Sequence, residues 1–399
     1  MAKVIFHFED GTQVEASAAI GENLLEVARK VNVAIDAPCS GNASCGKCKV
    51  KFLDGELDSK KTRHISEAEY NEGWRLSCVS TITGDVEVMV PDIASAYKSR
   101  MKVADLSSPE EIQIFNKATE EVKAAGVEFK NSFEILEIQM DEPTLDDTMP
   151  DNERLTWALQ GQTGKDHVKL SFTVLRKMAK VFREAAFAVK AVATVKDEEV
   201  FVYDVLPAGE EVSAYGIAID IGTTTVSGVI IDLLSGKILA KASSGNGQIR
   251  YGADVINRII EQQKPGGVEK LQKAVVEETM NPMIINMCRA AKIAPECIYR
   301  MSIGANTTMN HLLVGVDGDP IRMEPFIPTF FGTDSIHGRD LGLNVHPDAR
   351  IIIAPNIGSY VGGDITAGTL VSMVWAQEPF SLFVDLGTNG ELVFGNSDF

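Results

Sequence analysis

The chain has 399 residues, of which 45% are hydrophobic and 24% charged, and its formal net charge is −18 at pH 7. A chain of this length exceeds one compact core, so roughly two to four domains are expected. The negative charge argues against nucleic acid or an anionic membrane as a partner. Neither an apolar run of about 18 residues nor a leader pattern occurs, so a cytoplasmic protein without a membrane-spanning helix is expected.

The first 93 residues have the pattern of a small sheet with one helix. Residues 3–8 and 12–16 alternate apolar and polar side chains around Asp10-Gly11, which predicts a β-hairpin. Apolar residues at helical spacing predict a helix over residues 23–31. Further strands are predicted at residues 48–53 and 86–90.

Four cysteines, Cys39, Cys45, Cys48 and Cys78, are spaced as ligands of an iron–sulfur cluster. Three of them lie in a C-x5-C-x2-C loop of small residues, and the fourth lies far along the chain. Four sulfur ligands suit a [2Fe–2S] cluster, and small residues let backbone N–H groups face its sulfides. A zinc site, which usually takes paired ligands on both sides, and disulfides, which are rare in reducing compartments, are less favoured alternatives.

Residues 94–126 are predicted to form a helical linker, because Ser107-Ser108 precedes Pro109 and two glutamates, the pattern of a helix start. The linker is either a tether or a rigid spacer. Residues 127–207 are predicted to form a small α/β domain without a catalytic constellation. Its expected strands are residues 133–140, 188–196 and 199–205, and its expected helices are residues 152–160 and 174–187.

From residue 208 onward, two strand–turn–strand segments share the pattern Asp-x-Gly-Thr. Each glycine permits a tight turn whose N–H groups can face an anion, and carboxylates at strand ends can hold Mg²⁺. Together the turns predict a clamp for the β- and γ-phosphates of ATP, with two ordinary β-turns as the alternative. The residues assigned to this site are Asp220, Gly222, Thr223, Thr224, Thr225, Asp385, Gly387, Thr388, Asn389 and Gly390.

Strands and helices alternate around these turns, as in an α/β fold. His311 is expected to be a hydrogen-bonded helix residue rather than a ligand, and Cys288 and Cys297 are expected to be buried, inert thiols. The predicted strands are residues 215–221, 225–231, 237–243, 299–304, 351–354 and 382–393 with its turn, and the predicted helices are residues 253–262, 267–292, 306–313 and 362–374.

These motifs carry a resemblance to known families. Residues 1–93 resemble adrenodoxin-type ferredoxins, and the two turns resemble the phosphate-1 and phosphate-2 motifs of the acetate and sugar kinase/Hsp70/actin superfamily. Their combination, with the segments 304–313 and 354–364, resembles the ATP-dependent reductive activators of corrinoid proteins. The expected fold class is therefore a multidomain α+β and α/β chain. It comprises a β-grasp [2Fe–2S] ferredoxin domain at 1–93, a helical linker at 94–126, a small α/β middle domain at 127–207 and the first part of an actin-like, ribonuclease-H-like ATPase domain at 208–399.

The resemblance implies ATP-dependent, one-electron reduction of an inactive Co(II) corrinoid protein to Co(I), which reactivates a corrinoid-dependent methyltransferase system. It implies a [2Fe–2S] cluster and ATP with Mg²⁺ as cofactors, and a corrinoid protein and a low-potential electron donor as partners; it leaves homodimerisation open. No catalytic residue is assigned. The family continues with a second actin-like half, so a fragment or truncated chain with an incomplete nucleotide site is expected.

Three alternatives to this function stay open. The chain is a ferredoxin-type electron carrier whose actin-like part only docks a partner, an ATP-driven activator of another low-potential enzyme, or a small-molecule kinase with a fused ferredoxin.

Overall fold

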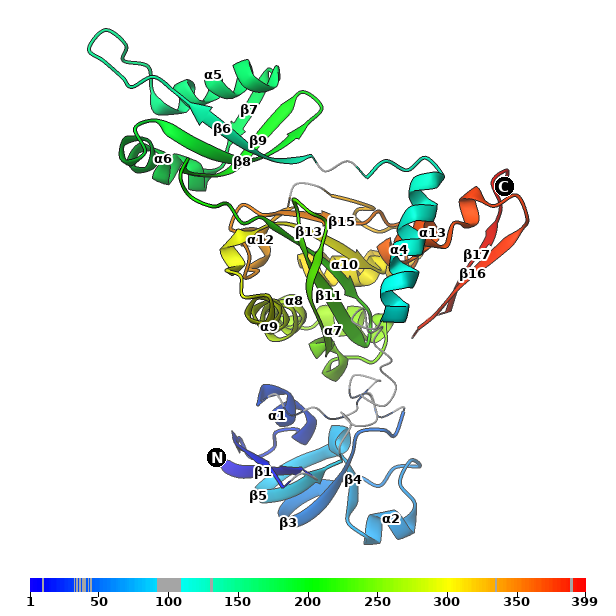
Figure 1. Ribbon diagram of the computed structural model, residues 1–399. Helices are drawn as coiled ribbons and strands as arrows, with labels where there is room; N and C mark the ends of the chain where they lie inside the picture. Colours follow the sequence, from blue (N-terminus) through cyan, green and yellow to red (C-terminus); the bar gives the residue numbers. More distant parts are fainter. Residues whose placement is uncertain are drawn as a thin grey trace.

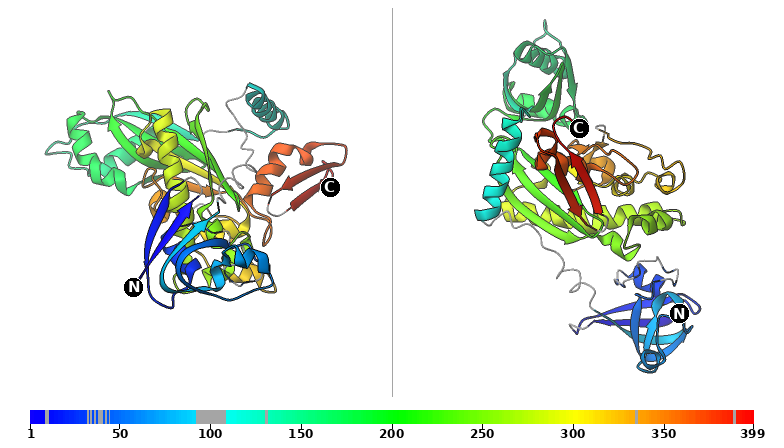
Figure 2. Two further views of the ribbon diagram at one scale, coloured as in Figure 1. Left: turned by 90° about the horizontal axis from the view of Figure 1, so that it is seen from below. Right: turned by 90° about the vertical axis from the view of Figure 1, so that its right-hand side faces the viewer.

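The computed structural model describes residues 1–8, 11–31, 33, 35, 37, 41, 43, 45–91, 109–129, 132–333, 336–387 and 390–399. A ferredoxin-like lobe and a small α/β lobe lie at opposite ends of a central sheet (Figures 1 and 2). The predicted fold class, a multidomain α+β and α/β chain, is confirmed. Among the described residues, no helix combines the length and the apolar character needed to cross a membrane.

The ferredoxin-like lobe is a five-stranded sheet in the order β2-β1-β5-β3-β4, in which β1 is antiparallel to β2 and parallel to β5. Gly11 follows β1 with a φ of +83°, which glycine adopts without strain; its predicted turn partner Asp10 lies outside the described residues. Asn23 begins the helix because its side chain accepts from the N–H groups of Leu25 and Glu26. The elements are β1 (Ala2–Phe8), β2 (Gln13–Ala18), α1 (Leu24–Lys30), β3 (Lys49–Ser59), α2 (Glu67–Asn71), β4 (Trp74–Leu76), η1 (Ser77–Val79) and β5 (Ser80–Val90).

The predicted linker helix is present as α4 (Pro109–Ala124), which contacts α13 (Gly363–Ser372) of the central lobe (Figure 1). The small α/β lobe follows, with the sheet order β6-β8-β9-β7. Strand β7 of this lobe was not predicted, because a strand of four residues is too short to show a clear alternation of apolar and polar side chains. The elements are β6 (Phe133–Gln139), α5 (Asp151–Thr163), β7 (His167–Leu170), α6 (Phe172–Glu184), β8 (Ala188–Lys196) and β9 (Glu199–Pro207).

The central sheet has six strands in the order β12-β11-β10-β13-β15-β14. Strands β10, β11 and β12 form an antiparallel meander, and β13 and β15 extend the sheet parallel to β10. Parallel strands end at the same edge, so the loops after β10, β13 and β15 meet there, as in α/β folds that bind ligands at this edge. The strands are β10 (Tyr215–Ile221), β11 (Thr225–Asp232), β12 (Ile238–Gly245), β13 (Ile298–Ala305), β14 (Ile336–His337) and β15 (Arg350–Ile353).

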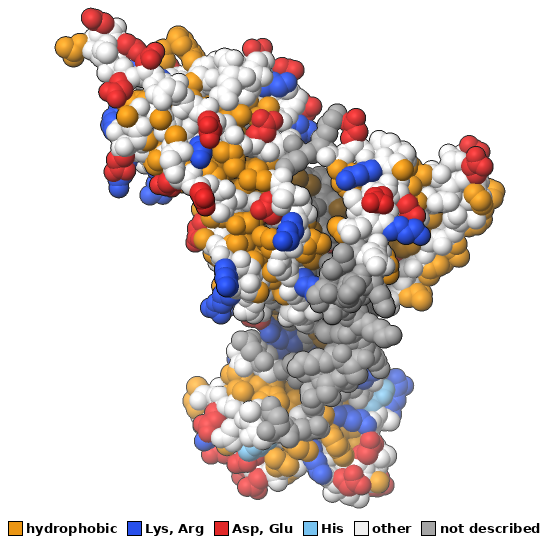
Figure 3. All heavy atoms as spheres, in the orientation of Figure 1, with side chains coloured by type: hydrophobic (Ala, Val, Ile, Leu, Met, Phe, Trp, Pro, Cys, Tyr) orange, Lys and Arg blue, Asp and Glu red, His pale blue; other side chains and the backbone are white. Residues whose placement is uncertain are grey.

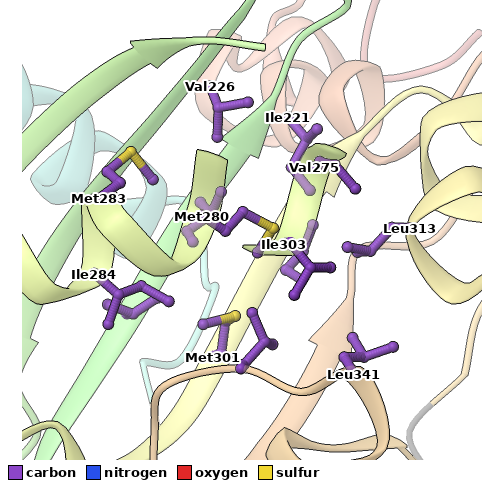
Figure 4. Close-up of a cluster of buried hydrophobic side chains, with 14 of the residues drawn as sticks. Ile221, Val226, Val275, Met280, Met283, Ile284, Met301, Ile303, Leu313 and Leu341 are labelled. Atoms are coloured by element: carbon purple, nitrogen blue, oxygen red, sulfur yellow. The ribbon is translucent and has the colours of Figure 1, made fainter. Parts of the chain in front are cut away.

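Helices pack on this sheet through a buried apolar core that includes Met280, Met301 and Ile303 (Figure 4). The single helix predicted over 267–292 is divided by a π-helical segment. Pro282 has no N–H to donate to the carbonyl four residues earlier, so the turn before it is free to widen. The helical elements are η2 (Gly247–Arg250), α7 (Val255–Gln262), α8 (Gly267–Val275), η3 (Val276–Met280), α9 (Asn281–Ala291), η4 (Pro295–Cys297), α10 (Thr307–Val314), α11 (Asp319–Arg322), α12 (Gly338–Leu341), α13 and η5 (Val374–Ala376).

The chain ends in a two-stranded hairpin of β16 (Ser381–Leu386) and β17 (Gly390–Gly395). It packs on α13 where the ring of Phe383 occupies the space that a side chain at Gly368 would need: a Cβ there would lie 2.5 Å from Phe383 Cζ. Several apolar side chains of the hairpin are exposed and are visible at the right edge of Figure 3. They are Leu382, Val384, Leu386, Leu392 and Phe394.

We expect Gly362→Ala to destabilise the central lobe. Gly362 begins α13 against the end of β13, and a Cβ there would lie 2.3 Å from the carbonyl oxygen of Ala305 and 2.5 Å from Asn306 Cα. These are backbone atoms that cannot move aside cheaply, so the free energy of unfolding should fall by about 1–3 kcal/mol. Gly358→Ala is the control, because its Cβ would meet nothing closer than Val361 Cβ at 4.0 Å. Equal melting temperatures for the two variants would contradict this packing.

Candidate functional site

Cys48 and Cys78 lie side by side in the ferredoxin-like lobe. Cys48 directly precedes β3 and Cys78 lies in η1 after β4, and the pairing of Lys49 with Leu76 brings the two segments together. The Ser77 N–H donates to the Cys48 carbonyl at 2.9 Å. Of the other predicted ligands, Cys45 lies three residues before Cys48, and Cys39 lies outside the described residues.

The surroundings of Cys48 favour its thiolate form. The Cys78 side chain hydrogen-bonds to it and lowers the pKa of the Cys48 thiol to about 6, although burial acts in the opposite direction. The thiolate is the form that binds metal. In the described part of the chain, which leaves out Cys39, no group of three or more His, Cys, Asp and Glu side chains is arranged to hold a metal ion. Among the described ligands, Cys48 and Cys78 are the pair joined by a side-chain hydrogen bond.

Two glycines of the loop around these cysteines have a backbone conformation that L side chains rarely adopt, and at Gly46 a side chain would also clash. Gly41 has a φ of +90°, and a Cβ there would lie 3.8 Å from Cys78 Cβ; Gly46 has a φ of +69°, and its Cβ would lie 2.5 Å from His64 Cβ. Asn23 Nδ2 donates to the Cys78 carbonyl at 2.9 Å and ties α1 to the same place. A tight loop with adjacent thiols fits a [2Fe–2S] cluster held by four cysteines.

The first Asp-x-Gly-Thr turn lies between β10 and β11, and its carbonyl groups point into the protein. The carbonyl of Gly222 accepts from Asn246 Nδ2 at 2.9 Å, that of Thr224 accepts from the Asn246 N–H at 2.8 Å, and that of Thr223 accepts from the Arg258 guanidinium. In a trans peptide the N–H points opposite to the C=O. The N–H groups of Thr223, Thr224 and Thr225 therefore point away from Asn246 and Arg258, an orientation in which a turn can present N–H groups to an anion.

Sequence reasoning missed Asn246 and Arg258. They are 2% and 0% exposed and lie behind the turn, in η2's N-cap and in α7. No local pattern marks them, because the turn that they support is 24 and 35 residues away along the chain.

Three carboxylates beside this turn have raised pKa values, and Asp385 contributes to each of them. Burial, Asp364 and Asp385 raise the pKa of Asp220 to about 6. Burial and Asp385 raise the pKa of Asp364, and burial, Asp364 and Asp385 raise that of Glu391. Asp220 keeps contact with solvent, as a carboxylate that takes up a cation must. The structure thus brings the predicted Asp220 and Asp385 to one place and adds Asp364 and Glu391, which were not predicted.

The second turn is described only at its ends. Leu386 pairs with Gly390 across the hairpin, and Gly387 follows β16. Thr388 and Asn389, the predicted phosphate donors of this turn, lie outside the described residues.

The residues expected to be inert have surroundings that suit this expectation. His311 is fully buried, with Nδ1 2.8 Å from the Thr307 carbonyl and Nε2 accepting from the Thr329 N–H at 3.0 Å. Cys288 is buried and Cys297 half-buried. Burial raises the pKa of the Cys288 thiol to about 11 and also raises that of Cys297. His311 is thus a hydrogen-bonded helix histidine, and both thiols are kept in the less reactive protonated form.

Comparison with known proteins identifies three sequence regions. The 2Fe-2S iron-sulfur cluster binding domain matches residues 7–83, the RACo linker region matches 122–211, and the RACo middle region matches 215–376. The chain is thus an iron–sulfur protein in which a ferredoxin domain precedes a small α/β domain and a larger lobe built on a mixed sheet. Residues 122–211 and 215–376 are thus similar to two regions that the RACo family models describe.

Individual relatives agree with this assignment. Over 199 residues, 49% of this chain and 33% of the relative, the sequence is 36% identical to the corrinoid activation enzyme RamQ of Eubacterium limosum. The solved structure of a reductive activator for corrinoid, iron-sulfur protein covers 100% of this chain at 29% identity and a TM-score of 0.62, and 62% of its own chain is covered. The chain therefore spans less than two thirds of these relatives. Over 74 residues, 18% of each chain, it is 36% identical to a component of the Na(+)-translocating NADH-quinone reductase of Mannheimia succiniciproducens.

We expect Cys78→Ala to abolish the visible absorption of the protein after anaerobic reconstitution with iron and sulfide, because a [2Fe–2S] cluster needs four sulfur ligands. Iron content should fall with it. Cys297→Ala removes a thiol outside the ferredoxin-like lobe and should keep both signals. Cluster absorption that survives in Cys78→Ala would show that another residue is the fourth ligand.

We expect Asp220→Asn to raise the melting temperature of the magnesium-free protein above pH 6. The ordinary pKa of an aspartate is 3.8 and the folded value is about 6, so the unfolded chain releases this proton first and stability falls as the pH rises through that interval. The gain should be a few degrees at most, because solvent screens an exposed carboxylate, and should vanish near pH 4. Asp398→Asn, an exposed position, is the control. A gain that grows towards low pH would have the wrong sign.

Proposed function

We propose that this chain belongs to a protein that reduces the inactive Co(II) form of a corrinoid protein to Co(I), one electron at a time and dependent on ATP. The observation that carries the proposal is the union, in one chain, of a region that matches a 2Fe-2S domain and a turn between β10 and β11 whose carbonyl groups are held by Asn246 and Arg258. Two relatives support it, since one is a corrinoid activation enzyme and the other a reductive activator for a corrinoid, iron-sulfur protein.

Cys39, Cys45, Cys48 and Cys78 would hold the [2Fe–2S] cluster. When bound, such a cluster takes up and releases single electrons at low potential. The protein's own part is to place the Cys48 and Cys78 thiols next to each other, and to fix Cys78 through Asn23. A low-potential donor would restore the electron after each transfer.

The nucleotide would bind at the edge of the central sheet. The N–H and hydroxyl groups of Gly222–Thr225 would face its phosphates, and Gly387, Thr388, Asn389 and Gly390 would close on them from the hairpin. Asp220 and Asp385 would hold Mg²⁺, with Asp364 beside them. The raised pKa values in this group support the assignment, because a bound cation relieves the repulsion between neighbouring carboxylates.

ATP would act through conformation, since it cannot change the energy of the electron directly. Plant-type clusters have potentials near −400 mV, and an uphill gap of roughly 100 mV corresponds to about 2.3 kcal/mol per electron. A nucleotide shifts an equilibrium only by the difference in its affinity for the two states. A preference of a few kcal/mol for the state that docks the corrinoid protein would be enough.

The test is to mix the reduced protein anaerobically with a Co(II) corrinoid protein and to record the visible spectrum with and without Mg-ATP. Co(I) should form with ATP and form at least about tenfold more slowly without it, as expected for a preference above ~1.4 kcal/mol. Cys78→Ala is the control for electron supply. Absence of Co(I) in both samples would overturn the proposal, and equal rates would favour an electron carrier whose actin-like part only docks its partner.

A further inference from the structure

Arg258 is a fully buried arginine that makes no ion pair with any carboxylate of the described residues. It lies in α7 and is 0% exposed. Its Nε donates to the Gly252 carbonyl at 2.8 Å, and its Nη1 is 3.2 Å from Gln248 Oε1 and 3.1 Å from Met309 Sδ. Its Nη2 donates to the Thr223 carbonyl in the first phosphate turn. All of these acceptors are uncharged.

Three other deeply placed arginines of the described chain are each compensated. Arg29 pairs with Glu26 at 2.8 Å, Arg154 pairs with Asp147 at 2.8 Å, and Arg250 pairs with Glu278. Charges taken out of water are normally paired in this way, because an uncompensated buried ion is costly. Arg258 differs from them, and burial lowers its pKa to about 9, with Asp254 acting weakly in the opposite direction.

The position of Arg258 explains how this cost can be offset. Its guanidinium touches the inner side of the turn, and the N–H groups of the same turn face outward. An anion held by those N–H groups would be separated from the guanidinium by little more than one peptide unit. A negative charge there is the counter-charge that the interior of the described chain does not provide.

We infer that Arg258 is a positioning residue for phosphate: it fixes the turn through Thr223 and balances the charge of a phosphoryl group bound by Gly222–Thr225. The inference rests on the proposed nucleotide site and names the residue that gives this site its positive charge. The ligand class is a di- or triphosphate, as the proposed nucleotide site requires; the turn presents neutral N–H groups to it and Arg258 supplies the positive charge.

The first experiment measures binding of inorganic pyrophosphate with Mg²⁺ to the 399-residue chain by titration calorimetry. Charge-assisted interactions are strong, so Arg258→Gln should lose about tenfold or more in affinity. Arg258→Lys can carry a positive charge once pyrophosphate is bound beside it, so, measured at about pH 6 where a buried lysine is more readily protonated, it should recover part of that loss. A purely structural role predicts the same loss in both variants, because lysine cannot reproduce the hydrogen bonds of a guanidinium.

The second experiment leaves Arg258 in place and changes its partner. Gln248→Glu sets a carboxylate against the guanidinium, and Gln248→Met removes the same amide without adding charge; both lose the donation of Gln248 Nε2 to the Leu271 carbonyl. If phosphate is the counter-charge of Arg258, the Glu variant should bind pyrophosphate about tenfold more weakly than the Met variant. This pair decides the question even where Arg258→Gln does not fold.

The outcomes separate this inference from the proposed function. Equal pyrophosphate affinity in Gln248→Glu and Gln248→Met, or wild-type affinity in folded Arg258→Gln, overturns the role of Arg258 and leaves the nucleotide site standing. A wild-type chain that does not bind pyrophosphate overturns the inference together with the phosphate turn. Cobalt reduction that depends on ATP, measured separately, then shows whether the wider proposal also fails.

Discussion

The central lobe depends on hydrogen bonds that hold the carbonyl groups of one turn inward. Asn246 and Arg258 bind three consecutive carbonyls of residues 222–224. Without these partners the turn would bury unsatisfied acceptors, each of which costs about 1–3 kcal/mol. With them, the same peptide units direct their N–H groups to the edge where β10, β13 and β15 end. Asn246, the N-cap of η2, and Arg258 in α7 therefore do two things at once. They satisfy the buried carbonyl groups of the turn, and they set the direction of its N–H groups.

The two functional regions are connected by contacts within the described chain. Arg29, near the end of α1, donates from Nε to the Arg250 carbonyl at 3.2 Å, and its guanidinium lies 5.9 Å from the Tyr251 ring. Arg250 ends the same η2 segment that Asn246 begins, and α1 begins at Asn23, which binds the Cys78 carbonyl. A continuous set of contacts thus extends from the turn to the cysteines. Contiguity is a condition for coupling between sites and does not by itself establish it.

Sequence reasoning found the features that are local and missed those that depend on distant pairing. The cysteine spacing, the hairpin at Gly11 and the turn at Gly222 are each set by neighbours in the chain, so the sequence showed them directly. Asp364 lies at the site because α13 packs beside β13, and Arg258 stands out only in the fold, where no carboxylate of the described residues pairs with it. Strand β7 and the π-helical segment before Pro282 escaped notice because each covers only four or five residues.

The charges at the edge of the central sheet are unbalanced in two opposite ways. Asp220, Asp364 and Asp385 crowd one another, which raises the pKa of Asp220 and Asp364, while Arg258 lies behind the turn without a carboxylate partner among the described residues. These groups do not neutralise one another, because the backbone of the turn stands between the guanidinium and the acids. Mg²⁺ alone would relieve only the carboxylates, and phosphate alone would relieve only the arginine. A magnesium–phosphate ligand at the proposed site would relieve both at once, which is the electrostatic argument for the complex over either part.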